Sequence, residues 1–116
     1  MTNEFRLWTG ISMQYTDFFV SPNGYFYQFE NDKLEPTHPS CKLMIFTGVY
    51  DKNGEEVYEG DILLCCDEFG VVEYNRYMAS FECKFKSNTK SIDYIVSNHL
   101  DIIIIGNIYE NPKLIK

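Results

Sequence analysis

An Asn-Gly pair between two apolar, β-rich runs constrains the fold of this chain more than any other feature. Residues 51–54 (Asp-Lys-Asn-Gly) separate the apolar run 42–50 from the run that begins at Val57. Asn-Gly is the preferred pair for a two-residue hairpin loop, because both residues tolerate a positive φ. We therefore predict an antiparallel hairpin that residues 51–54 close with a two-residue loop.

The rest of the chain repeats this pattern of short β-rich runs between turn residues. A hairpin around Ser21-Pro22-Asn23-Gly24 joins runs 13–20 and 25–29, and residues 31–40, with two prolines, indicate a loop. Gly60-Asp61 precedes another apolar run, and the next turn is predicted at 67–70. Further strands are predicted at 5–8, 42–50, 62–64, 71–74, 79–86, 92–96 and 100–108. Residues 92–100 could instead form a short helix.

Two of these strands carry the most specific packing predictions. In residues 79–86, Phe81, Cys83 and Phe85 share one face, and the charged residues share the other. The four isoleucines 102–105 are apolar on both faces, which predicts a paired, interior strand that is covered on both sides.

Helix is scarce, since no segment of 11 residues has a 3.6-residue apolar period. Asn111-Pro112 suits a helix N-cap followed by proline, with room for at most one turn. A chain of 116 residues suits one domain. The predicted fold is mostly β: a small SH3-like barrel over about 42–112, with an additional N-terminal β-hairpin region over about 1–40.

Charge is concentrated in one part of this acidic chain, whose net charge is −7. Six acidic residues and no basic one lie between Glu55 and Glu68. Such a stretch repels nucleic acid and attracts a basic partner, although it would equally keep an inert domain soluble. We predict a protein-binding surface at the acids expected in turns and at strand starts, which are Glu55, Glu56, Asp67 and Glu68.

The alternative function is nucleic-acid binding by the one basic stretch, residues 74–86. Single-strand binding needs aromatic rings and positive charge on the same surface. The alternation in 79–86 puts the phenylalanines opposite the lysines, which leaves Tyr74, Arg76 and Tyr77 as the candidates.

Aromatic residues make up 16% of the chain, which is more than one small core can bury completely. This composition predicts self-association through β-pairing or an aromatic patch.

The four cysteines, Cys41, Cys65, Cys66 and Cys83, supply no pair of pairs for zinc. Cys65 and Cys66 are adjacent in a strand-like run, so their side chains are expected on opposite faces. We predict four reduced thiols, no metal and no cofactor. His38 and His99 form no recognisable catalytic pattern with them.

No nucleotide-binding, metalloprotease or hydrolase motif occurs. Glu55, Glu59 and Asp61 could pair their carboxylates for metal or acid–base chemistry, but a solvated acidic rim explains them better. We therefore predict a protein that is not an enzyme. No window is long and apolar enough for a membrane span, and the first residues lack the features of a signal peptide, so the expected location is the cytoplasm.

Two blocks resemble a known family. Residues 43–62, with Asp51-Lys52-Asn53-Gly54 and Tyr58-Glu59-Gly60-Asp61-Ile62, and residues 105–112, Ile-Gly-Asn-Ile-Tyr-Glu-Asn-Pro, are similar to the YopX family of small phage and prophage proteins. The start, Phe5-Arg6-Leu7-Trp8, matches more loosely. The resemblance implies a mostly β fold, a phage or prophage of a Gram-positive host and a place in the host cytoplasm. That family has no established activity, so no catalytic residue carries over. The resemblance implies an accessory protein that binds a protein partner or assembles with itself.

Overall fold

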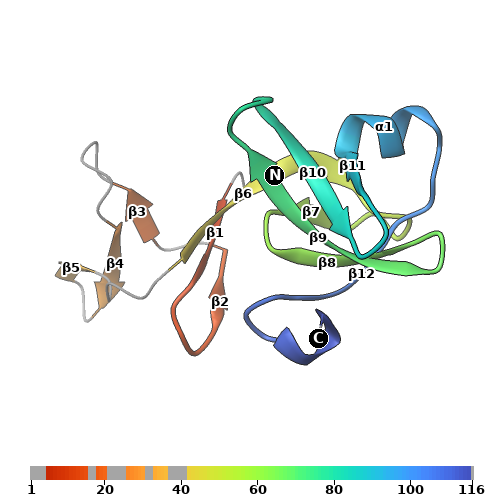
Figure 1. Ribbon diagram of the computed structural model, residues 1–116. Helices are drawn as coiled ribbons and strands as arrows, with labels where there is room; N and C mark the ends of the chain where they lie inside the picture. The colour runs from red at the N-terminus through yellow and green to blue at the C-terminus, as the bar shows by residue number, and fades with distance from the viewer. Residues whose placement is uncertain (1–4, 16–17, 21–25, 31–32, 37–41, 116) are drawn as a thin grey trace. The chain divides into compact units, whose positions relative to one another are not determined.

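The computed structural model describes residues 5–15, 18–20, 26–30, 33–36 and 42–115 (Figure 1). The chain divides into two compact units, residues 1–45 and 46–116, and the boundary falls inside strand β6 (Lys42–Tyr50). The described residues are mostly β, with one short α-helix and one 3₁₀ turn. The prediction of a mostly β chain with little helix is confirmed.

The first unit contains two small antiparallel arrangements of strands. Strand β1 (Phe5–Trp8) pairs with β2 (Met13–Gln14) and with the first residues of β6. The other sheet has the order β3 (Phe18–Val20), β4 (Phe26–Glu30), β5 (Lys33–Pro36). The antiparallel pairing of β3 with β4 confirms the predicted hairpin, although its turn, residues 21–25, lies outside the described residues.

Two predictions for this unit are wrong. The single strand expected over 13–20 is two short strands, β2 and β3, in different sheets. The loop expected over 31–40 contains β5, which ends at Pro36. Proline cannot donate to a sheet ladder, and β5 tolerates it because β5 is an edge strand.

The second unit is built on a five-stranded antiparallel sheet that curls into a half-barrel (Figure 1). Its order is β11 (Thr89–Ser91), β10 (Ser80–Phe85), β9 (Glu68–Asn75), β8 (Asp61–Cys65), β12 (Ile103–Asn107). Strand β7 (Glu56–Tyr58) pairs with the end of β6, helix α1 (Ile92–Ser97) packs against β10 and β11, and the 3₁₀ turn η1 (Pro112–Ile115) lies against β9.

The core of the second unit lies on the inner face of this sheet. Its buried members are Val57, Leu63, Cys65, Val72, Cys83, Phe85, Ile92, Ile95 and Ile102. Cys83 and Phe85 are buried and Phe81 packs against them, whereas Lys84 is exposed, so the alternation predicted for 79–86 is confirmed. The strand predicted over 92–96 is wrong, and its helix alternative is confirmed. These residues begin α1, because the Ser91 side chain accepts a hydrogen bond from the Tyr94 amide and caps the helix.

The isoleucine strand occupies a different place from the one predicted. Strand β12 pairs antiparallel with β8, but it is an edge of the sheet and not an interior strand. Ile102 is buried, while the three isoleucines after it are only half-buried. The 51–54 turn supplies hydrogen-bond partners for the free side of this edge strand, in place of a neighbouring strand. The Lys52 amide donates to the Ile102 carbonyl, and the Ile104 amide donates to the Asp51 carboxylate.

Two hairpin loops of this unit, β6–β7 and β8–β9, differ from their predicted forms. Residues 51–54 do close the antiparallel β6–β7 hairpin, but with a three-residue loop, Lys52 to Gly54. Within this loop only Gly54 has a positive φ, of 80°. One glycine with positive φ at the end of a three-residue loop is typical of a bulged hairpin, whereas the two-residue loop expected of Asn-Gly needs a positive φ at both residues. The two-residue loop lies instead between β8 and β9, at Cys66 (φ 51°) and Asp67 (φ 64°). The turn predicted at 67–70 is therefore displaced, and 68–70 belong to β9.

Candidate functional site

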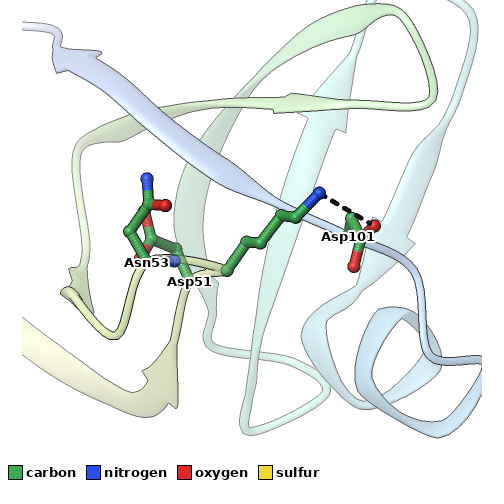
Figure 2. Close-up of polar contacts among 4 residues, drawn as sticks. Asp51, Asn53 and Asp101 are labelled. Carbon is green, nitrogen blue, oxygen red and sulfur yellow. Dashed lines mark hydrogen bonds and ion pairs between the residues drawn. The ribbon is translucent and has the colours of Figure 1, made fainter.

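The residues of the 51–54 motif serve the fold. Asp51 is only 7% exposed, and one carboxylate oxygen accepts hydrogen bonds from the amides of Asn53 (2.9 Å) and Glu55 (2.8 Å). The other oxygen accepts from the Ile104 amide at 3.1 Å. Figure 2 shows Asp51 and Asn53 at this turn and the nearby ion pair of Lys52 with Asp101, 3.7 Å long and largely exposed. Asp51 thus ties the hairpin to the edge strand and has no oxygen directed to a ligand.

The carboxylates considered for acid–base chemistry do not form a pair. Asp61 is 1% exposed, and its carboxylate accepts from the Tyr58 amide at 2.7 Å, which confirms its predicted capping role. Glu59 lies in the turn before β8 and not on a shared strand face, and Glu55 lies in the β6–β7 loop. Burial and this backbone contact make Asp61 a structural residue.

The four predicted acidic binding residues lie at two turns. Glu55 and Asp67 are exposed, whereas Glu56 and Glu68 are half-buried in strands. The Glu56 carboxylate accepts from the Tyr58 hydroxyl and the Glu68 carboxylate from the Ser87 hydroxyl, each at 2.7 Å. Two of the four acids therefore have structural partners, and Glu55 and Asp67 have the greatest freedom to meet a partner.

The tip of the β9–β10 hairpin presents large exposed side chains on a fixed backbone. Tyr77 is 99% exposed and Met78 is 72% exposed. The Asn75 side-chain oxygen accepts from the amides of both, at 3.0 and 3.1 Å, and the Asn75 side-chain nitrogen donates to Glu82. The sequence analysis missed Asn75 and Met78. The sequence feature that could have indicated them is Asn75 itself, since asparagine often accepts a hydrogen bond from the amide two residues later in an Asx turn.

The candidate nucleic-acid residues share this hairpin. Arg76 and Tyr77 are exposed at the tip, while Tyr74 lies in β9 with its ring edge-on to Phe81, the centroids 5.1 Å apart. Of the lysines in the basic stretch, Lys84 is paired with Glu73 at 2.9 Å. Glu73 and Glu82 lie opposite each other on β9 and β10, the strands that carry this tip, so the hairpin is not a basic surface.

The described residues of the second unit line several hollows, of which two lie beside residues considered above. A groove of about 600 Å³ runs between β9, β10 and η1, with Phe69, Leu114 and Ile115 exposed along it and Lys84 and Lys86 beside them. A smaller hollow of about 290 Å³ lies between the 51–54 turn and the end of α1, where His99 and Asp101 line it. Among the residues that the structure describes, no group of three or more His, Cys, Asp or Glu could hold a metal ion.

The cysteines depart from the expected arrangement. Cys65, Cys66 and Cys83 are free thiols, while Cys41 lies outside the described residues. Cys65 is buried and Cys66 exposed, yet their sulfur atoms are only 3.8 Å apart, because the left-handed conformation of Cys66 reverses the chain. The expectation of opposite faces is therefore wrong. Burial, with a smaller effect of Cys66, raises the pKa of the Cys65 thiol to about 11, and burial raises the pKa of Cys83 to about 12.

Replacing Cys66 with asparagine should stabilise the protein by about 0.5–1 kcal/mol. A positive φ is costly for cysteine, whereas asparagine is a preferred residue of a two-residue loop in which both residues have positive φ. Chemical denaturation of the Cys66→Asn variant measures this gain. The control is Cys66→Val, whose β-branched side chain should lower stability by a similar amount, and equal stability of the two variants would contradict the assigned conformation.

The fold and these surfaces define a small, mostly β protein with exposed turns and a half-barrel core. The family model for YopX protein matches residues 4–116, and the chain belongs to the YopX family. Protein yopX from Bacillus subtilis has a similar crystal structure, with 20% identity, a TM-score of 0.70 and 100% of each chain covered. The crystal structure of protein EF1440 from Enterococcus faecalis is also similar, with 25% identity, a TM-score of 0.64 and 97% of each chain covered. No curated protein matches the chain.

Neither the family nor these two structures adds a site residue, so candidate sites rest on this chain's own geometry. In the part of the chain that the structure describes, no helix is long and apolar enough to cross a membrane.

Proposed function

We propose that this chain is a phage or prophage accessory protein without catalytic activity, which acts in the host cytoplasm by binding a protein partner. The observation that supports this most is the β9–β10 tip, where Tyr77 and Met78 are exposed on a backbone that Asn75 holds in place. Tyrosine and arginine are the residue types that most often dominate interface energies. Because the two Asn75 hydrogen bonds favour one backbone conformation of the tip, binding through it costs less backbone entropy.

The exposed acids supply a second, electrostatic component of this proposal. Glu55 and Asp67 stand at turns on a chain of net charge −7. A basic partner would be drawn toward them at long range, which accelerates association and weakens as salt screens it. The tip would then hold the partner, and the acids would steer it.

The experiment captures partners from host lysate with the tagged protein, with and without nuclease, and measures binding of the captured partner. We expect the double variant Tyr77→Ala/Met78→Ala to weaken binding by at least tenfold, mainly through faster dissociation. The matched control is Tyr94→Ala, which removes a half-exposed tyrosine from α1. Equal losses in both variants, or none in the tip variant, would contradict the role of the tip.

A quadruple change of Glu55, Glu56, Asp67 and Glu68 to Lys tests the steering component. We expect slower association and a reversed salt dependence, with a smaller change in dissociation. The double variant Glu55→Gln/Asp67→Asn keeps the hydrogen bonds of Glu56 and Glu68 and so separates the effect of charge from that of structure. An unchanged association rate in both variants would leave these acids as a solubilising surface.

The alternative function is nucleic-acid binding through Tyr74, Arg76 and Tyr77, and the exposed Arg76 and Tyr77 at the tip are the observation in its favour. This alternative predicts that nuclease abolishes capture and that Arg76→Ala lowers the dependence of affinity on salt.

Self-assembly is a further form of the protein-binding proposal, with the groove of Phe69, Leu114 and Ile115 as its surface. Light scattering separates self-assembly from binding to another protein, since a mass of 13.6 kDa at all concentrations indicates a monomer.

A further inference from the structure

The β9–β10 hairpin has exposed apolar side chains at both of its ends. At the tip, Tyr77 and Met78 are exposed on a backbone held by two hydrogen bonds. At the other end lies the groove beside η1, where Phe69, Leu114 and Ile115 are exposed. None of these five side chains is a buried member of the core. Apolar surface of this kind often marks an interaction site, so each end of the hairpin is a candidate contact surface.

The groove has the size and the lining of a pocket that receives side chains. Its volume of about 600 Å³ lies within the range of about 300–1,000 Å³ that is usual for binding pockets. Phe69 and Val71 of β9 line one side, and Leu114 and Ile115 of η1 line the other. The turn η1 buries none of its own residues, so its two apolar side chains are open to an incoming group.

The tip cannot fill the groove of its own chain. Strand β9 has eight residues, which span roughly 25 Å when extended. Its pairing with β10 continues from Asn75 to Gly70, so the hairpin is extended between its two ends. Figure 1 shows the tip of the hairpin at the top of the view and η1 at the bottom. A contact between tip and groove must therefore join two copies of the chain.

The charges of the two surfaces are complementary. Behind the tip, Glu73 and Glu82 lie directly opposite each other, an arrangement in which like charges repel. Lys86 lines the groove and forms no ion pair within the part of the chain that the structure describes. At the tip itself Arg76 is exposed, and the groove contains Glu68. Each surface therefore offers a charge opposite to one on the other.

We propose that copies of this chain assemble head to tail, with the β9–β10 tip of one copy seated in the groove of the next. The contact joins two different surfaces, so it produces a ring if the rotation between copies closes and a filament if it does not. Small contacts are weak, and assembly should therefore be reversible and depend on concentration. This inference rests on the self-assembly form of the proposed function, and it names the two surfaces that meet.

Light scattering over a wide range of concentrations tests the contact with variants of each surface. Tyr77→Ser/Met78→Ser removes the apolar tip, and Leu114→Ser/Ile115→Ser removes one side of the groove. All four side chains are exposed, so the variants should fold. We expect the mass of the unchanged protein to rise with concentration and each variant alone to stay at 13.6 kDa. Phe69→Ser is a second groove variant that leaves η1 unchanged.

The decisive measurement mixes the tip variant with the groove variant. The first supplies an intact groove and the second an intact tip, so we expect a complex of two chains, of twice 13.6 kDa, that grows no further. Formation of this complex also shows that both variants are folded. A contact between identical surfaces cannot be restored by mixing. A mixture that stays monomeric, from variants that still unfold cooperatively on heating, would overturn the head-to-tail contact.

The remaining outcomes separate this inference from the proposed function. A mass of 13.6 kDa for the unchanged protein at every concentration would overturn both the head-to-tail contact and self-assembly, and capture from lysate would then decide whether the chain binds another protein. The matched control, Tyr94→Ser/Val96→Ser, removes two half-exposed side chains of α1 and should assemble normally. Assembly that persists in the tip or groove variant, or that is lost in this control, would overturn the tip–groove contact alone.

Discussion

Replacing Asp51 with alanine is expected to lower the free energy of unfolding by about 3 kcal/mol. The Asp51 carboxylate accepts hydrogen bonds from three backbone amides, those of Asn53, Glu55 and Ile104, and it is almost wholly buried. Losing a buried acceptor leaves donors unpaired, at about 1–3 kcal/mol for each group that water cannot reach. Denaturant unfolding followed by tyrosine and tryptophan fluorescence measures the loss.

Two variants of the same turn separate these contacts. Asp51→Asn keeps one oxygen as acceptor for the amides of the loop, but it places its own NH₂ group against the Ile104 amide, which is also a donor. We therefore expect about half of the stability loss of Asp51→Ala. Asn53→Ala removes an exposed side chain and should cost less than about 0.5 kcal/mol. If Asn53→Ala were as damaging as Asp51→Ala, the turn would depend on the asparagine and not on the buried carboxylate.

Gly70→Ala is expected to destabilise the protein by about 2–3 kcal/mol. A Cβ at this position would lie 2.5 Å from the Cys83 sulfur and 2.8 Å from two ring carbons of Phe85. Cys83 and Phe85 are both buried in the core, so neither can move into open space. Overpacking of this kind costs about 1–3 kcal/mol. The same unfolding measurement applies.

A double-mutant cycle tests the steric cause. In a Cys83→Ala background, the nearest atom to the new methyl group is absent, so Gly70→Ala should cost at least about 1 kcal/mol less. Phe85 still contacts the methyl group, and part of the cost should remain. Additive effects would mean that the glycine matters through its backbone freedom and not through the space it leaves.

The sequence blocks that resemble the family contain carboxylates that stabilise the fold. Asp51 and Asp61 lie in the blocks through which the chain resembles its family, and both carboxylates hold backbone amides. The most recognisable residues therefore mark the fold. The candidate surfaces are elsewhere, at the β9–β10 tip and in the groove beside η1. Their exposed apolar side chains are not buried members of the core.

The candidate sites were only partly predictable. Tyr77 and the exposed acids followed from their place in basic and acidic stretches. Met78 and the proximity of Cys65 to Cys66 did not, because the rule that adjacent strand residues point to opposite faces fails where the strand ends. Cys66 lies just past the end of β8 in a left-handed conformation, and no pattern in the printed residues announces that change.

The sequence by itself determined the local elements of this protein. Alternation predicted the buried face of β10, the 51–54 turn predicted the β6–β7 hairpin, and Gly60-Asp61 predicted the start of β8. These features depend on residues a few positions apart, whose conformational preferences act in any context. The tertiary structure alone decided that β12 is an edge strand and that Asp51 covers it. That contact joins residues 53 positions apart, and only the folded chain brings such backbone groups within hydrogen-bonding distance.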